Sequence, residues 1–111
     1  MTPAEVRQFH PLGGVSDSEI EAHLRSSLRK LEGRSFLSDE DKIEAVACQT
    51  IIYIAPLLWA RGMQNLSGYE TVYTSAGDVE TFQNIWRSRL EEVILRSKKS
   101  EEKRRIQWAG A

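Results

Sequence analysis

Apolar residues recur at helical spacing in three stretches of the chain. In the first stretch they follow one another at steps of four, four and three, and are Ile20, Leu24, Leu28 and Leu31. This spacing places them on one face of a helix. Ser16 and Glu19 precede and open the stretch in the arrangement of a capping box. The pattern predicts an amphipathic helix over about residues 17–32.

The second stretch is apolar on nearly every face. Ser38, followed by three acidic residues, marks its start, and the pair Arg61-Gly62 marks its end. A helix that is apolar all round belongs in the middle of a core. Proline has no backbone N–H to donate, so Pro56 predicts a kink or a break beginning near Ile52.

Two further helices follow from the pattern. A capping box that opens at Thr2 predicts a short helix ending near Phe9. The last helix is expected from near Asp78 to about Arg96. Its apolar face consists of Val79, Phe82, Trp86, Leu90 and Val93.

Together these elements predict an all-α fold. It is a small bundle of three main helices plus a short N-terminal helix, a long loop over residues 62–77 and a charged C-terminal tail. Residues 1–96 then form a helical domain, and residues 97–111 form a basic tail. Within the loop, residues 69–74 are rich in strand-favouring types, which predicts an extended segment or an edge for pairing with another chain.

Charge separates the tail from the rest of the chain. The protein has 111 residues and a net charge of −1, so it has no broad attraction to nucleic acid or to an anionic membrane. Residues 1–95 hold 9 basic and 14 acidic residues, whereas residues 96–111 hold 6 basic and 2 acidic. The tail is expected to be either an exposed helical extension or disordered. A compact domain of this length has a radius of gyration of roughly 13 Å.

The residues that usually carry chemistry are few and scattered. Cys48 is the single cysteine, which excludes internal disulfides and cysteine-based zinc sites. His10 and His23 lack metal-ligand spacing. The acidic run 39–41, with Glu44, is typical of a helix N-terminus. We therefore expect no catalytic residues, no cofactor and no metal, and expect that the protein is not an enzyme.

A basic side on the 17–32 helix has three interpretations. Four basic residues contribute to it: Arg25, Arg29, Lys30 and Arg34. Acidic residues share the helix, and this mixture favours a solvated face over a protein contact or a nucleic-acid contact.

The chain has more large apolar residues than three helices readily bury. Four on the broad side of the 38–61 helix are candidates for a subunit interface: Ile52, Tyr53, Leu58 and Trp59. In the loop the candidates are Tyr69, Val72 and Tyr73. The alternative is that the first helix and the long loop cover them.

The tail holds a further set of candidate partner-binding residues: Arg104, Arg105, Ile106 and Trp108. An aromatic residue beside a basic stretch is typical of an anchor for a partner's pocket. An unordered end, or a tail that folds back on the domain, would account for Trp108 equally simply.

The layout of the chain resembles a known family. The segment TPAEVRQFHPL, the helix VSDSEIEAHLRSSLRKLEG, the apolar helix SDEDKIEAVACQTIIYIAPLLWARG, the long polar loop and the closing helix together resemble the small head–tail connector (adaptor) proteins of tailed bacteriophages and prophages. The resemblance covers about residues 3–96. It implies a structural subunit that forms a homo-oligomeric ring below the portal and joins capsid to tail.

The resemblance also implies partners and a location. These are the portal protein and a tail-completion protein, with DNA passing through the channel without specific binding and with no membrane contact. It assigns the loop 62–77 to neighbouring subunits or the next tail component, and residues 97–111 to the portal. The location would be the virion, assembled in the bacterial host cytoplasm. The alternative is a small helical regulatory or protein-binding module, for example a dimer, whose basic tail touches nucleic acid.

Overall fold

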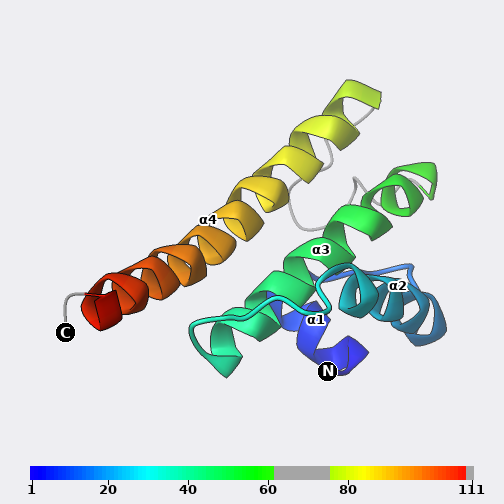
Figure 1. The fold of residues 1–111 in the computed structure, drawn as a ribbon. Helices are drawn as coiled ribbons and strands as arrows, with labels where there is room; N and C mark the ends of the chain where they lie inside the picture. Colours follow the sequence, from blue (N-terminus) through cyan, green and yellow to red (C-terminus); the bar gives the residue numbers. More distant parts are fainter. Residues whose placement is uncertain (62–75, 110–111) are drawn as a thin grey trace.

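The computed structural model describes residues 1–61 and 76–109, and within the last helix the side chains of residues 79–98. Its helices are α1 (Pro3–Phe9), α2 (Asp17–Lys30), α3 (Asp39–Ala60) and α4 (Ala76–Ala109) (Figure 1). The described residues contain no strand. The predicted all-α bundle, with a short N-terminal helix and three longer ones, is confirmed. The expected extended segment 69–74 lies outside the described residues.

The helix starts follow the capping signals in the sequence. At α1, the Thr2 side chain accepts from the Glu5 N–H, and the Glu5 carboxylate accepts from the Thr2 N–H. Ser16 and Glu19 repeat this arrangement at α2. At α3, the Ser38 hydroxyl accepts from the Asp41 N–H at 3.1 Å. Each contact satisfies backbone donors that the first turn of a helix leaves unpaired.

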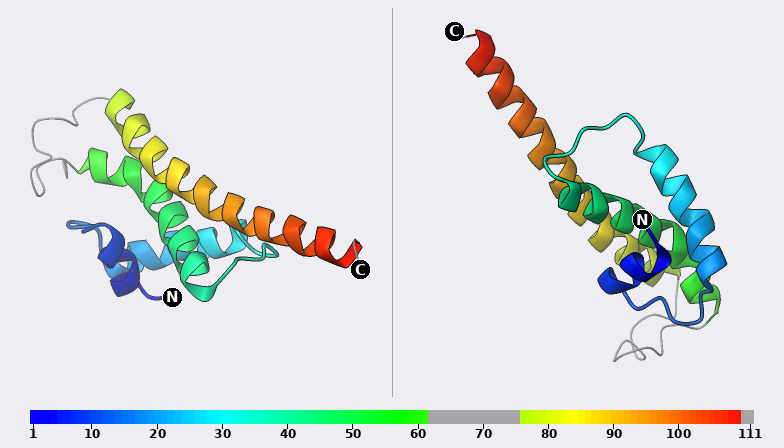
Figure 2. Two further views of the ribbon diagram at one scale, coloured as in Figure 1. Left: turned by 90° about the vertical axis from the view of Figure 1, so that its left-hand side faces the viewer. Right: turned by 90° about the horizontal axis from the view of Figure 1, so that it is seen from below.

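Helix α3 is the centre of the bundle. It packs against α1, α2 and α4, and α1 also contacts α2. In the described part of the chain α2 and α4 make no backbone contact with each other, because they lie on different sides of α3 (Figure 2). Twelve of the 22 residues of α3 are buried, which confirms the prediction that this helix lies in the core.

The face of the second helix predicted to be buried is confirmed at Ile20, Leu24 and Leu31 but not at Leu28. Leu28 was expected to face the core but is 41% exposed. The buried positions instead include Ser27, whose Oγ lies 2.9 Å from the Thr50 hydroxyl of α3. Two small polar side chains thus bring α2 and α3 together, which leaves Leu28 at the outer edge of the contact.

The structure corrects the predicted interface on α3. Ile52 and Leu58 are only 6% and 2% exposed, so they belong to the protein's own core. Trp59 is half-buried, and its ring lies 5.1 Å from that of Phe82 in α4. Tyr53 is also half-buried. Packing within the bundle therefore accounts for apolar residues that the sequence suggested for a subunit interface.

Helix α3 continues through Pro56, so the expected break does not occur. Proline at this position deprives the Ile52 carbonyl, four residues earlier, of its usual N–H donor. The Gln83 side chain of α4 takes over that role, since its Nε2 donates to the Ile52 carbonyl at 3.0 Å. A side chain from the neighbouring helix thus satisfies the acceptor that the proline leaves open.

Helix α4 is longer than predicted. It was expected to end near Arg96 but runs without interruption to Ala109, so the helical extension is the form the tail takes. Lysine, arginine, glutamate and glutamine are good helix formers even without an apolar stripe. The molecule measures 57 × 26 × 19 Å, and its radius of gyration is 16.3 Å instead of the roughly 13 Å of a compact domain. The end of α4 stands away from the other helices (Figures 1 and 2).

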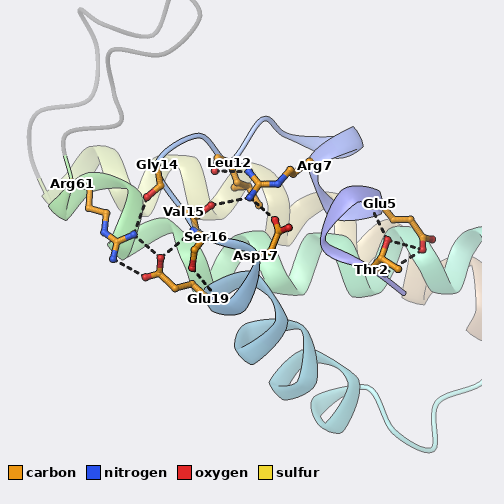
Figure 3. A network of polar contacts seen from close by, with 10 residues as sticks. All are labelled: Thr2, Glu5, Arg7, Leu12, Gly14, Val15, Ser16, Asp17, Glu19 and Arg61. Atoms are coloured by element: carbon orange, nitrogen blue, oxygen red, sulfur yellow. Dashed lines mark hydrogen bonds and ion pairs between the residues drawn. The ribbon is translucent and has the colours of Figure 1, made fainter.

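Two arginines fix the connection between α1 and α2 (Figure 3). Arg7 donates to the carbonyls of Leu12 and Val15 and to the Asp17 carboxylate, at 2.8–2.9 Å. Arg61, at the end of α3, donates to the Gly14 carbonyl at 2.8 Å and to both carboxylate oxygens of Glu19. These contacts hold the connection against the body of the protein.

The Glu19 contact predicts a dependence of stability on pH. Hydrogen bonds from Arg61, then from the Ser16 N–H, lower the pKa of Glu19 from 4.5 to about 2. The contribution of this group to stability is therefore present above pH 4.5 and is lost as the pH falls towards 2. Urea midpoints measured from about pH 5.5 down to about pH 2.5 should fall less steeply for Glu19→Gln than for the wild type.

The matched control is Glu21→Gln, which removes a carboxylate from an exposed position on the same helix. It should keep the wild-type pH profile. Equal slopes for Glu19→Gln and the wild type would show that the Arg61 contact contributes nothing in solution.

Candidate functional site

The described residues offer no metal-binding cluster and no reactive thiol. No group of three or more His, Cys, Asp or Glu side chains in that part of the chain is placed to hold a metal ion. Cys48 is fully buried, and burial raises the pKa of its thiol to about 12. The thiol is therefore protonated at neutral pH and is not a nucleophile.

The two histidines pack against aromatic rings. His10 lies edge-on to Phe82, with ring centroids 5.2 Å apart, and burial lowers its pKa. The neutral imidazole is therefore favoured at neutral pH, as expected for a ring in an apolar cluster. The ring of His23 lies 6.4 Å from that of Tyr53.

The acidic residues at the start of α3 pair with α4. The Glu44 carboxylate accepts from Arg89 Nε at 2.7 Å. Arg96 Nη2 lies 3.4 Å from Asp41 Oδ1 and 3.6 Å from Glu44 Oε2. The guanidinium of Arg89 also lies over the rings of Phe9 and Trp86, 5.2 and 5.3 Å from their centroids. These carboxylates help to fix α4 on α3, in addition to stabilising the N-terminus of α3.

A groove lies over the face of α3 that α2 and α4 leave open. Its volume is about 450 Å³, within the usual range for ligand sites. Gln49, Ile52 and Tyr53 of α3 form the floor, Lys30 of α2 lies on one side, and Arg87 of α4 lies on the other. The groove therefore combines a floor of one polar and two mainly apolar side chains with a cation on each wall.

The projecting end of α4 is the second candidate surface. The side chain of Ser97 is the last buried one described in α4, at 6% exposure. Its Oγ accepts from the Leu37 N–H at 3.1 Å, which ties α4 to the connection between α2 and α3. Ser97 was predicted as the first residue of the tail, but it belongs to the packed body.

The predicted partner-binding residues fall in two places. The α4 backbone carries the four tail candidates beyond the last packed position: Arg104, Arg105, Ile106 and Trp108. The three loop candidates lie outside the described residues: Tyr69, Val72 and Tyr73. For both sets, partner binding remains a prediction.

Sequence reasoning missed the groove and its two glutamines. Gln49 lies on the apolar helix and Gln83 on the closing helix, and neither forms part of a recognisable motif. The signal that was present is Pro56, because a proline inside a helix requires a donor from elsewhere for the carbonyl four residues before it.

By length and composition alone, α3 is apolar enough to cross a membrane. In the fold, 61% of its most apolar window is buried among the other helices. The apolar character of α3 thus serves the core of the bundle.

Comparisons of this chain with protein-family models, with curated proteins and with solved structures found no match.

Proposed function

We propose that the protein is a structural assembly subunit, a head–tail connector of a tailed bacteriophage or prophage. In this role it forms a ring below the portal and joins capsid to tail, and it belongs to the virion, assembled in the host cytoplasm. The observation that carries the proposal is α4, which runs as a helix from the packed body to Ala109. Beyond Ser97 this helix extends by roughly 18 Å at 1.5 Å per residue.

An isolated helix of this length is only marginally stable in water. Most helical stability in proteins comes from packing against a neighbour, so a helix that leaves its own bundle favours a role in docking. The basic composition of residues 96–111 favours an acidic partner surface.

Charge also suits a subunit that surrounds DNA without gripping it. Residues 1–95 hold more acidic than basic residues, and an acidic or neutral channel wall does not retard a polyanion. A ring needs two different contact patches on each subunit, because its contacts are heterologous. The acidic residues 1–95 and the basic residues 96–111 of one chain provide two such patches of opposite charge.

The second candidate function is a regulatory or protein-binding module whose tail touches nucleic acid. The five basic residues of the tail, residues 97–111, favour it. The two functions differ in what the tail binds, and this difference is measurable.

The test compares the full chain with a variant lacking residues 99–111. Because the body packs through Ser97, the deletion should change the free energy of unfolding by less than about 0.5 kcal/mol. Native mass spectrometry and electron microscopy with a phage portal protein should show rings for the full chain and none for the variant. Trp108→Ala should weaken ring formation, whereas Leu95→Ala, at a position 50% exposed on the packed part of α4, should not.

Two results would overturn the proposal. One is a full chain that binds duplex DNA at physiological salt and forms no ring with or without the portal. The other is a deletion variant that unfolds, because the tail would then be part of the core.

A further inference from the structure

The floor of the groove contains a largely buried glutamine whose amide is open to the groove. Gln49 is only 8% exposed and lines the groove. Among the residues that the structure describes, none makes a hydrogen bond to the Gln49 side chain. The neighbouring glutamine differs, because Gln83 uses its amide on the Ile52 carbonyl. The Gln49 amide is not among the fully buried unpaired polar groups of the described residues, so it reaches the open space of the groove, where a ligand can bond it in place of water.

A carboxamide presents one acceptor and two donors from the same group. A peptide unit of an extended chain presents the complementary C=O and N–H, and the two can bond side by side. The peptide units of a helix are already hydrogen-bonded within the helix. The occupant that suits Gln49 is therefore an extended segment.

The walls of the groove define the charge of that segment. In the described part of the chain, ion pairs occupy Arg7, Arg61, Arg89 and Arg96. Lys30 and Arg87 take part in none of the ion pairs found there, although Arg87 donates to Asn84 at 2.8 Å. Two cations on opposite walls, above apolar Ile52 and Leu90, complement acidic side chains that flank an apolar one.

We infer that the groove over α3, between α2 and α4, binds an extended acidic peptide segment of a partner protein. Gln49 hydrogen-bonds one peptide unit, and Lys30 and Arg87 pair with carboxylates on either side of it. Neither residues 97–111 nor ring formation enters this argument, so it stands apart from the proposed assembly role.

The test selects from a displayed library of random linear peptides on the full chain. The selected peptides are expected to carry aspartate or glutamate on both sides of an apolar residue. Fluorescence anisotropy with a selected peptide should show that Lys30→Glu combined with Arg87→Glu weakens binding at least about tenfold. The matched control is Arg25→Glu, an exposed position of α2 outside the groove, which should leave affinity within about twofold.

Gln49→Met separates a binding role from a structural one. Methionine fills the same space without polar atoms, so the variant should unfold at the same temperature as the wild type or higher. Its affinity for the selected peptide should fall at least about fivefold. If Gln49 had a purely structural role, the variant would change the unfolding temperature and would not change the affinity for the selected peptide.

Three results would overturn the inference. The first is a library that yields no binder or no acidic preference. The second is Arg25→Glu weakening binding as much as the groove variants do. The third is sedimentation in which the wild type self-associates and the groove variants do not. In the last case, a second copy of the chain covers the groove.

Discussion

Replacing Ile51 with alanine should destabilise the protein by about 3 kcal/mol, the cost of removing a large buried side chain. Ile51 is fully buried in α3, the helix that contacts all the others. Because the shortened side chain leaves a cavity that rigid neighbouring helices close only in part, the lost contacts are not regained. A domain of this size has a total stability of only about 5–15 kcal/mol. The variant should therefore melt more than about 10 °C below the wild type.

Ile85→Ala is the matched control for Ile51→Ala. The side chain of Ile85 is 57% exposed on α4, so the same chemical change should cost less than about 0.5 kcal/mol. Urea unfolding followed by circular dichroism measures both variants. Equal costs at the two positions would mean that α3 is not the centre of the core.

Replacing Gln83 with leucine should cost about 1–2 kcal/mol, because it leaves the Ile52 carbonyl without a donor. The loss of stability arises because the Ile52 carbonyl is left unpaired. It does not depend on the size of the side chain at position 83. Urea unfolding of the variant gives the change in free energy directly.

A double-mutant cycle with Pro56→Ala tests this explanation. Alanine at position 56 restores the backbone N–H that pairs with the Ile52 carbonyl, so Gln83→Leu should then cost at least about 1 kcal/mol less than in the wild type. Costs that simply add would show that Gln83 stabilises the protein in some way other than by compensating for the proline.

The starts of the first three helices could be predicted because they depend on local signals. Thr2, Ser16 and Ser38 each cap a helix where the sequence indicates. The C-terminal end of α4 was left open between a helical extension and disorder because apolar periodicity stops near Arg96, whereas helix propensity continues through the charged tail.

Burial of particular side chains could not be predicted from periodicity alone. Leu28 shares the spacing of Ile20 and Leu24, which are buried as predicted, but Ser27 contacts Thr50 of α3 and Leu28 lies outside that contact. Ile52 was predicted to lie at a subunit interface because the pattern of one helix does not show how many other helices will cover that helix. In the fold, three neighbouring helices cover α3.

The candidate groove was beyond sequence reasoning for a similar reason. Lys30, Gln49 and Arg87 come from three helices, and only the relative placement of α2 and α4 brings them to one opening. Lys30 belongs to the basic side of α2, and a protein contact is one of the three interpretations of that side. The peptide proposal develops that interpretation.

The hydrogen bond between Leu37 and Ser97 gives the molecule a mechanical property. It joins residues 60 positions apart in the chain, at the point where α4 leaves the bundle. A sideways force on the projecting end of α4 bends the helix about its last contacts with the bundle. These are the Leu37–Ser97 hydrogen bond and the nearby Arg96 pairs with Asp41 and Glu44. Strain applied at the tip is therefore delivered to the connection between α2 and α3.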